Sequence, residues 1–263
     1  MEALNIIKAG GAILEDPEKL EVFLKSFSEL SGNKLLVHGG GREATELGNK
    51  LGLEVKMVQG RRITDDDYID IVTMTYGGLI NKRLVAKLQG LGVNALGLTG
   101  ADGNLIKSKK RPVTNGIDYG WVGDPESVNT QLISGIIQSG VVPVCAPLTH
   151  DGSGHLLNTN ADTIASVLSS ALSQSFEVHL IFAFELPGVM KDVNEPETLI
   201  KKINPTSYQE LKESKQIFDG MIPKLDNAFA AIDKGVSSVK IINYQAIGKL
   251  SDPMFDSFTQ IEG

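Results

Sequence analysis

The segment at residues 35–41 constrains the fold of this chain most, because an apolar run ends there in three consecutive glycines. It reads Leu-Leu-Val-His-Gly-Gly-Gly, and residues 42–51 that follow have a helical pattern. A strand that passes into a helix through glycines presents backbone N–H groups at the helix N-terminus, and the main chain is open to close approach. The amides and the helix dipole favour an anion there. We therefore predict a strand–turn–helix unit that binds a negatively charged group, with an ordinary tight turn as the alternative.

The four letters His-Gly-Gly-Gly also supply oxyanion-hole amides in lipase-like hydrolases, so a serine esterase is a competing hypothesis. That enzyme class needs a downstream Gly-x-Ser-x-Gly elbow, and the sequence contains none, since residues 152–154 are a plain Gly-Ser-Gly turn. A Gly-x-x-x-x-Gly-Lys-Ser/Thr loop is absent from the sequence as well. Any phosphate site is therefore not of the P-loop type.

Length and composition indicate a globular protein with a substantial core. The chain has 263 residues, 41% of them hydrophobic, and no apolar run reaches the roughly 18 residues of a membrane span. The formal net charge of −7 argues against a nucleic-acid or anionic-membrane partner, because both need a basic surface. We expect a cytoplasmic protein in which any anionic substrate is met by local lysines and arginines.

The single cysteine, Cys145, lies in an apolar run at residues 141–147. A lone cysteine makes no intrachain disulfide, and its apolar neighbours favour a core position over a role as nucleophile. A reducing compartment is expected.

The first strand repeats the pattern of a strand followed by glycines. Residues 4–8 are apolar up to Lys8, and Gly10 and Gly11 follow. A helix begins near Asp16 and returns the chain to the strand before the triple glycine, which makes a parallel β-α-β unit. A lysine at the carboxyl end of such a strand lies at the edge where ligands bind, although a lysine that only extends to solvent is the alternative.

Strand and helix patterns alternate along the rest of the chain, which predicts a mainly parallel sheet covered on both faces. Two features bear on a site: only one of the adjacent Arg61 and Arg62 is expected to face inward, and Thr64 is expected to cap a helix that runs to about residue 88. The remaining expected elements are a hairpin at 57–63, strands at 94–98, 141–146, 178–182 and 238–242, helices at 131–139, 163–173 and from 219, and a solvated basic loop at 107–111.

Polar residues at 150–162 have structural and functional interpretations. His150 and His155 flank a Gly-Ser turn without the spacing of a robust metal site, so no metal ligands are predicted. Asn160 is a good helix N-cap and Asp162 falls in the first turn, while the functional alternative is a polar helix mouth that faces a ligand.

Five segments, taken together, resemble the amino acid kinase family in their order and spacing, and they extend over nearly the whole chain. They are residues 8–11 (Lys-Ala-Gly-Gly), 38–41 (His-Gly-Gly-Gly), 60–64 (Gly-Arg-Arg-Ile-Thr), 158–162 (Asn-Thr-Asn-Ala-Asp) and 219–224 (Asp-Gly-Met-Ile-Pro-Lys). The resemblance implies an α/β fold, a three-layer α/β/α sandwich with a mainly parallel open sheet. Its N-terminal lobe, residues 1–175, would bind the acyl-amino acid and dimerise, and its C-terminal lobe, residues 176–263, would bind ATP.

The resemblance also implies an activity. A kinase of this kind would use ATP, with Mg²⁺ held mainly by the nucleotide phosphates, to phosphorylate the side-chain carboxylate of N-acetyl- or N-succinyl-L-glutamate in the second step of arginine biosynthesis. Arginine-inhibited members resemble this chain with an added N-terminal helix, so the start of the first strand at about Leu4 predicts an arginine-insensitive homodimer. The alternatives are a kinase of a related amino acid or of a carrier-bound aminoadipate, or a non-catalytic ligand-binding member.

Site residues follow from the resemblance position by position. Lys8 and Lys224 would flank the transferred phosphoryl group and Asp162 would hold them in place. The substrate would be bound by Gly40, Gly41, Arg62 and Asn158. The nucleotide would be bound by Gly10, Gly11, Glu185, Leu186, Pro187, Gly188, Val189, Met190, Gln216, Ile217 and Phe218. Phe184 and Glu185 depart from the family's usual Ser/Thr-Asp at this point, which is the best sequence support for the non-catalytic alternative.

Overall fold

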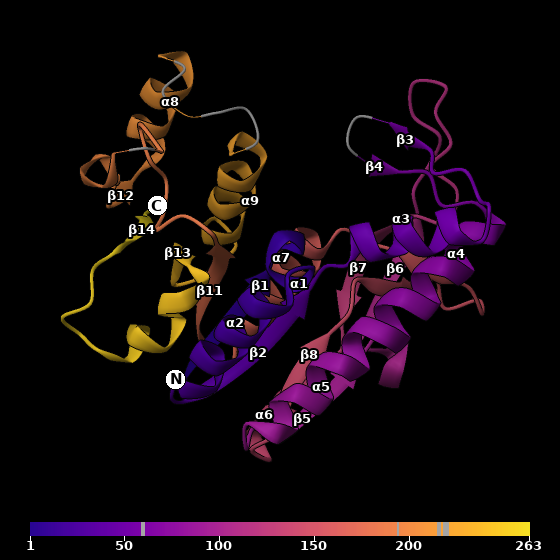
Figure 1. Cartoon of the computed structure of the whole chain (residues 1–263), viewed down its shortest axis with the longest axis horizontal. Coiled ribbons are helices and arrows are strands. Elements are labelled where there is room, and N and C mark those ends of the chain that lie inside the picture. Colours follow the sequence, from indigo (N-terminus) through magenta and orange to yellow (C-terminus); the bar gives the residue numbers. More distant parts are fainter. Residues whose placement is uncertain (59–60, 194, 215–216, 218–220) are drawn as a thin grey trace. The chain divides into compact units, whose positions relative to one another are not determined.

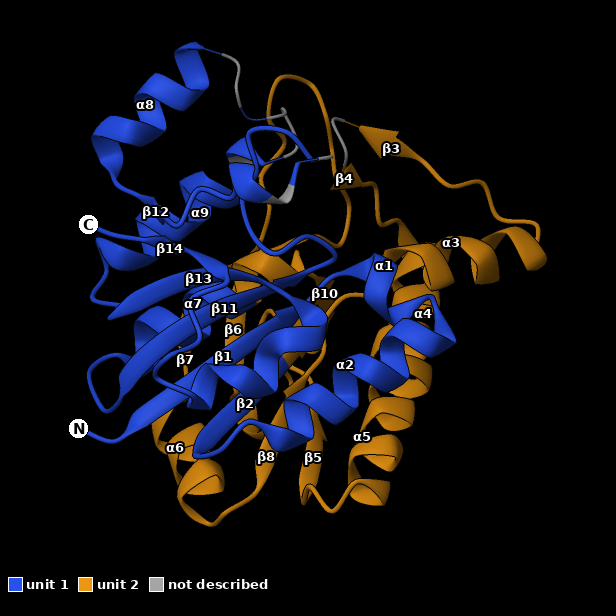
Figure 2. Cartoon of the chain, turned by 60° about the vertical axis from the view of Figure 1, so that its left-hand side comes forward, with its two compact units in different colours: residues 1–36, 165–263 blue, residues 37–164 orange. Residues whose placement is uncertain are grey.

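The computed structural model describes residues 1–58, 61–193, 195–214, 217 and 221–263 (Figure 1). The chain is an α/β protein with a large, mostly parallel sheet, and it divides into two compact units, residues 1–36 with 165–263 and residues 37–164 (Figure 2). The predicted lobes, 1–175 and 176–263, follow a different division, and their assignment to substrates stays a prediction. None of the helices in the described part of the chain is long and apolar enough to cross a bilayer.

The strands of the first unit are buried and mainly parallel. Strand β1 (Ala3–Ala9) pairs in parallel with β11 (Glu177–Phe184), which pairs in parallel with β13 (Ser238–Asn243), while β14 (Phe258–Ile261) is antiparallel to β13. Near-continuous apolar runs explain the burial, because parallel strands are covered on both faces. The order is β12 (Lys202–Ile203), β14, β13, β11, β1 and β2 (Asn33–His38), whose residues from Val37 onward belong to the second unit.

Helices cover both faces of these strands. The connection from β1 to β2 passes through α2 (Pro17–Glu29), and the connection from β11 to β13 passes through α9 (Ile222–Ile232). Strand β2 lies on one side of the β11–β1 pair and β13 on the other, so the two connections run in opposite directions across the sheet. Right-handed crossovers therefore place α2 and α9 on opposite faces (Figure 2). The unit also contains α1 (Gly11–Leu14), most of α7 (Ala161–Leu172), η3 (Pro196–Thr198), α8 (Pro205–Glu213) and η4 (Tyr244–Ser251).

Local chemistry fixes both ends of α2. The Asp16 side chain accepts hydrogen bonds from the backbone N–H groups of Glu18 and Lys19, and Pro17 occupies the first turn. At the other end the buried Lys34 Nζ donates to the carbonyls of Phe27, Ser28 and Leu30 at 2.8, 3.0 and 2.6 Å. Burial lowers the pKa of Lys34, and the three carbonyls offset the cost of placing an ammonium there.

The second unit contains a parallel strand pair, a small sheet and a hairpin. Helices α5 (Asn81–Gly90) and α6 (Thr130–Gln138) pack against the parallel strands. The parallel pair is β5 (Ala95–Leu98) with β8 (Val142–Cys145); the small sheet has the order β10 (Leu156–Asn158), β9 (Leu148–His150), β6 (Ile106–Lys110) and β7 (Gly123–Val128); the hairpin is β3 (Met57–Val58) with β4 (Arg61–Arg62). Its helices are α3 (Gly41–Lys50), α4 (Asp66–Val72), η1 (Thr73–Ile80), α5, η2 (Asp102–Asn104) and α6.

The long helix expected up to about residue 88 is helical throughout but changes type. Its middle part, η1, is a π-helix, in which the hydrogen bonds reach one residue further and the turn is wider. The expected cap is wrong: the Asp65 side chain accepts from the Tyr68 N–H, while Thr64 is fully buried. Asp65 is one residue nearer the helix than Thr64 and caps it, and the Thr64 hydroxyl makes a different contact.

The expectation of a solvated loop at 107–111 is wrong in part. Most of this run forms the strand β6, but Lys107, Lys109 and Lys110 are exposed as expected. Ser108 is buried, and the Arg111 guanidinium pairs with Asp124. Beyond the predicted strand at 238–242, β14 adds an antiparallel edge strand to β13 that the sequence patterns did not indicate.

Candidate active site

The carboxyl ends of β1 and β11 bring two predicted segments of the first unit together. In the parallel register Lys8 lies opposite Phe182 and Ala9 opposite Ala183. The glycine turn that follows β1 and the segment 185–190 that follows β11 therefore leave the sheet at the same edge. A Cβ placed on Gly10 would lie 3.9 Å from the Ala183 carbonyl oxygen, which is ordinary contact.

Phe184 makes a direct contact with a predicted catalytic lysine. Lys224 lies in the first turn of α9, and its Nζ is 4.3 Å from the centroid of the Phe184 ring. A cation over an aromatic face is attracted by the ring's quadrupole. Phe184, which stands where the family usually has Ser or Thr, thus contacts the lysine through its aromatic ring.

The segment after β11 is anchored by its backbone. The Glu185 carbonyl accepts from Asn243 Nδ2, the Val189 N–H donates to Thr259 Oγ1 at 2.8 Å, and a Cβ on Gly188 would lie 2.4 Å from that hydroxyl. The Glu185 carboxylate pairs with Lys19. Ile217 is buried, whereas the predicted nucleotide residues Gln216 and Phe218 lie outside the described residues, as do residues 60, 219 and 220 of the family motifs.

In the second unit the triple glycine opens α3, as predicted. Gly40 needs to be glycine for steric reasons, because a Cβ there would lie 2.4 Å from Ile80 Cδ1 and 2.8 Å from Tyr76 Cδ1. Both side chains come from η1. The π-helix thus packs directly against the glycine turn.

Arg62 faces inward and Arg61 is exposed, as the alternation predicted. Arg62 Nη2 donates to the Gly41 carbonyl and to Thr45 Oγ1, both at 2.7 Å, and the guanidinium carbon is 4.8 Å from the Tyr68 ring centroid. Burial raises the pKa of Tyr76, and the charge of Arg62 opposes that rise. Thr45, Tyr68 and Tyr76 were not singled out from the sequence, because only the folded chain brings them to Arg62.

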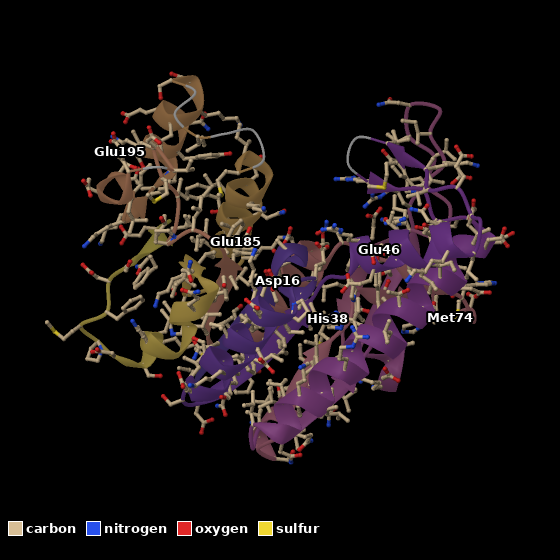
Figure 3. The ribbon with its side chains drawn as sticks, viewed as in Figure 1. Asp16, His38, Glu46, Met74, Glu185 and Glu195 are labelled. Atoms are coloured by element: carbon tan, nitrogen blue, oxygen red, sulfur yellow. The ribbon has the colours of Figure 1, made fainter. Side chains whose placement is uncertain are left out.

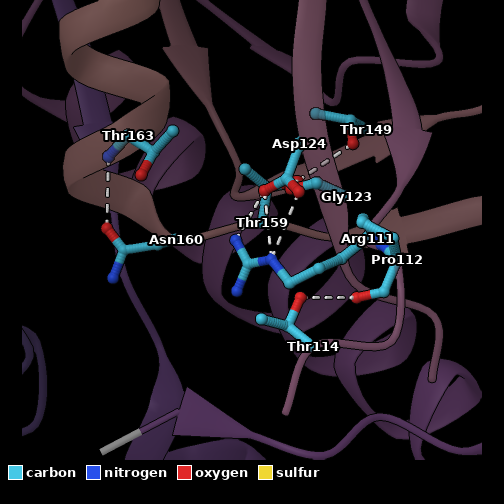
Figure 4. A network of polar contacts seen from close by, with 9 residues as sticks. All are labelled: Arg111, Pro112, Thr114, Gly123, Asp124, Thr149, Thr159, Asn160 and Thr163. Atoms are coloured by element: carbon cyan, nitrogen blue, oxygen red, sulfur yellow. Dashed lines mark hydrogen bonds and ion pairs between the residues drawn. The ribbon is translucent and has the colours of Figure 1, made fainter. Parts of the chain in front are cut away.

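The motif at residues 158–162 is held by hydrogen bonds within the second unit. Asn158 Nδ2 donates to Thr64 Oγ1 at 3.0 Å, so the Thr64 hydroxyl contacts Asn158 while Asp65 caps α4. Thr159 Oγ1 lies 3.0 Å from Thr149 Oγ1 and 3.3 Å from the Gly123 carbonyl (Figure 4). Asn160 Oδ1 accepts from the N–H groups of residues 162 and 163 at 2.8 and 3.1 Å, which confirms its predicted role at the start of α7. These hydrogen bonds position the backbone from which the Asn158 and Asp162 side chains project.

The remaining sequence candidates have structural roles. His155 Nδ1 pairs with Asp151 Oδ2 at 2.7 Å and its ring stacks on Trp121 with centroids 4.8 Å apart. No group of three or more histidine, cysteine or acidic residues is placed to hold a metal within the residues that the structure describes. Cys145 is buried as predicted, and burial, with the charge of Asp102, raises the pKa of its thiol to about 12.

The structure is an α/β protein in which β1 ends in Lys8 and a glycine turn, at the edge where open parallel sheets commonly bind ligands. The sequence pattern of the amino acid kinase family matches residues 3–243, and the chain belongs to this family. An acetylglutamate kinase of Cytophaga hutchinsonii is 55% identical over 250 residues, covering 95% of both chains, and one of Methanopyrus kandleri is 38% identical over 93% of this chain and 96% of the relative.

Solved structures resemble this chain at lower identity. A carbamate kinase from Giardia lamblia bound to AMP-PNP matches 99% of this chain and 98% of that chain, with a TM-score of 0.67 and 12% identity. An N-acetylglutamate synthase from Neisseria gonorrhoeae, complexed with coenzyme A and N-acetyl-glutamate, matches 100% of this chain and 59% of that chain, with a TM-score of 0.81 and 22% identity. These likenesses establish the fold.

Proposed function

We propose that this protein phosphorylates the side-chain carboxylate of an N-acyl-L-glutamate with ATP, forming an acyl phosphate in the second step of arginine biosynthesis. The observation that carries the proposal is the 55% identity, over 95% of both chains, with an enzyme named acetylglutamate kinase. The acyl group is acetyl or succinyl. We also propose that the protein is a cytoplasmic homodimer. Sedimentation equilibrium would measure its mass in solution and test the dimer.

The chemistry needs electrostatic stabilisation more than proton transfer. The nucleophile is a carboxylate, which is ionised at neutral pH and requires no general base. The main barrier is the approach of this anion to a triphosphate, and cations and backbone amides lower it by stabilising the equatorial oxygens of the transferred group. Holding both substrates in line lowers the barrier further.

The residues of the first unit would handle the nucleotide. Lys8, at the end of β1, and Lys224, in the first turn of α9, would neutralise charge that develops on the phosphoryl oxygens. Gly10 and Gly11 would offer amides to the β-phosphate, and the anchored segment 185–190 would line the nucleotide. Mg²⁺ would travel with the nucleotide, since Mg²⁺ in phosphotransferases is commonly bound through substrate phosphates and few carboxylates.

The residues of the second unit would handle the acceptor. Arg62 and Asn158 would bind the α-carboxylate of the glutamate, and the amides of Gly40 and Gly41 would meet the phosphoryl group and the substrate. Asp162 would orient the lysines. The contacts of Arg62 with Gly41 and Thr45 support this role, because they fix a cation beside the glycine turn.

The direct test is an assay that traps the acyl phosphate with hydroxylamine, using ATP, Mg²⁺ and either N-acetyl- or N-succinyl-L-glutamate. We expect hydroxamate with at least one of the two, and the ratio of kcat/KM values identifies the acyl group. No product with either would overturn the substrate, and product from another amino acid or from a carrier-bound aminoadipate would point to a different kinase. Substrate binding in a calorimeter without turnover would identify a non-catalytic member.

The lysine roles have their own test. Lys8→Ala and Lys224→Ala should each lower kcat by roughly 100-fold or more, as loss of a group that stabilises transition-state charge does. Lys25→Ala, an exposed lysine on α2, is the matched control and should leave kcat unchanged. Near-normal turnover of both site variants would rule out the two-lysine mechanism.

A further inference from the structure

His38, the residue before the triple glycine, is fully buried at the end of β2 (Figure 3). Its Nδ1 lies 2.8 Å from the carbonyl oxygen of the next residue, Gly39, and its Nε2 lies 3.1 Å from Asn81 Nδ2. Both ring nitrogens therefore have a defined partner within the second unit. His38 belongs to the motif at residues 38–41, but the roles proposed above assign nothing to its side chain.

The partners determine the position of the ring proton. The Gly39 carbonyl can only accept, so Nδ1 carries the hydrogen and donates it. The orientation of the Asn81 amide is set independently: its Nδ2 donates to the Val144 carbonyl at 2.9 Å, and its Oδ1 accepts from Lys82 Nζ at 3.2 Å. Asn81 thus offers an N–H to Nε2, which must hold a lone pair. The ring is the neutral Nδ1–H tautomer.

The electrostatic surroundings maintain this neutral form. Burial lowers the pKa of His38 to about 4, and the charge of Lys82 lowers it as well, whereas the hydrogen bond to Gly39 favours the protonated ring. A second proton on Nε2 would also face the N–H of Asn81. At physiological pH the ring therefore holds one proton, directed at Gly39.

The chain makes room for the Asn81 amide. Asn81 is the first residue after the π-helix η1 and is 1% exposed. A Cβ on Gly97 would lie 1.9 Å from Asn81 Oδ1, so only glycine at 97 admits the amide in this orientation. π-Helical turns are rare and are frequently found at functional sites. The wide turn and the glycine together place an asparagine where it can orient a buried ring.

The direction of the Gly40 amide follows from this arrangement. A peptide unit is planar and trans, so its C=O and N–H point in opposite directions. A hydrogen bond that fixes the Gly39 carbonyl also fixes the Gly40 N–H. We propose that His38, held in its Nδ1–H tautomer by Asn81, is a positioning residue that aims the Gly40 amide at the phosphoryl group in transfer. The proposal rests on the proposed function, in which Gly40 meets that group.

Two replacements of His38 separate this role from simple packing. In His38→Asn the side-chain Nδ2 occupies the position of imidazole Nδ1 and can still donate to Gly39, whereas His38→Leu fills the space without a donor. We expect His38→Leu to lower kcat by roughly 10- to 100-fold, up to the scale of losing one donor to transition-state charge, with KM for ATP nearly unchanged. His38→Asn should stay within about threefold of wild type. Equal losses of kcat in two folded variants would overturn the proposal.

The tautomer itself is measurable without any activity. In protein labelled with ¹⁵N-histidine, the His38 signals should show a protonated Nδ1 and an unprotonated Nε2, and Asn81→Leu should shift the Nε2 signal and the Gly40 amide resonance. Finding the Nε2–H tautomer in wild type, or an unmoved Gly40 amide in Asn81→Leu, would overturn the proposal. Absence of N-acylglutamate turnover in wild type would instead contradict the proposed function, and the tautomer measurement distinguishes the two failures.

Discussion

Phe184 is the residue at which the chain departs most clearly from the family pattern, and its contact with Lys224 gives that departure a physical role. The ammonium lies 4.3 Å from the ring centroid, within the distance at which cation–π attraction operates. A hydroxyl at this position would offer a hydrogen bond, whereas the Phe184 ring attracts the Lys224 ammonium through the ring's quadrupole and limits its movement by the ring's bulk. The Phe184 ring thus supplies a contact for the Lys224 ammonium.

Replacing Phe184 tests that role. Phe184→Leu removes the ring's quadrupole but keeps an apolar side chain, and an exposed cation–π contact is worth about 0.5–1 kcal/mol, so we expect kcat to fall by about two- to fivefold. Phe184→Tyr keeps a ring and should match wild type within about twofold. Steady-state kinetics with saturating ATP measures the effect. Identical kcat values for the leucine and tyrosine variants would show that the ring does not act on Lys224.

At the scale of secondary-structure elements, helices α3 and α4 meet through a glycine that the sequence did not mark. Gly48 lies inside α3, and a Cβ there would be 2.3 Å from Tyr68 Oη. Tyr68 is 2% exposed and its ring lies under the Arg62 guanidinium. The close approach of the two helices therefore determines where the arginine is held.

A matched pair of glycine-to-alanine variants measures this packing. Alanine normally stabilises a helix interior by about 0.5–1 kcal/mol relative to glycine, and Gly135→Ala in α6 should do so, because nothing lies within 4 Å of its Cβ position. Gly48→Ala should instead lower the free energy of unfolding by about 1 kcal/mol, since overpacking costs about 1–3 kcal/mol. It should also raise KM for the N-acylglutamate by displacing Tyr68 from Arg62. Urea unfolding and substrate kinetics give both quantities, and equal stability changes in the two variants would refute the packing argument.

Sequence patterns predicted the elements whose signals are local. The alternation of strands and helices, the glycine turns and the inward arginine follow from periodicity, glycine and side-chain alternation over a few residues. The π-helix and the cap at Asp65 were missed, because each depends on a distant partner: residues 76 and 80 pack on Gly40, and Asn158 engages the Thr64 hydroxyl. The strand β6 was missed because a run of basic residues is more typical of a solvated loop than of a strand.

The same distinction holds for the site in the whole molecule. Lys8, the glycine turns and Asn160 lie in recognisable local motifs. Thr45 and Tyr68 contact Arg62, and Asn81 contacts His38, only after segments far apart in sequence have packed. No property of their sequence neighbourhoods marks these residues. The net charge of −7 adds a global constraint that composition did predict: anionic substrates approach an acidic protein, so fixed local cations have to offset that field.

The stability of the whole molecule should depend on acid through His38, and the sign of the effect follows from its environment. Its pKa is about 4 in the folded protein against an ordinary 6.5, so unfolding takes up a proton in the intervening range. The contribution of neutral His38 to the free energy of unfolding is therefore complete above about pH 6.5 and is lost as the pH falls toward 4. At about 1.4 kcal/mol per pKa unit it amounts to at most about 3 kcal/mol. His179, whose pKa burial also lowers, adds to the loss in the same direction.

The Asp151 carboxylate titrates in a lower pH range than His38, which keeps the two effects on stability distinct. Partial burial raises the pKa of Asp151, but hydrogen bonds from Ser153 and His155 outweigh this effect and bring the pKa to about 2. The contribution of Asp151 to folding stability is therefore lost only as the pH falls below 3.8, the ordinary pKa of an aspartate. Urea unfolding at pH 7.5, 6.0 and 4.5 should therefore show a decline for wild type that is smaller for His38→Asn, which has no titrating ring. A parallel decline in the two proteins would mean that His38 is not buried in its neutral form, and it would weaken the assignment of its single proton to Gly39.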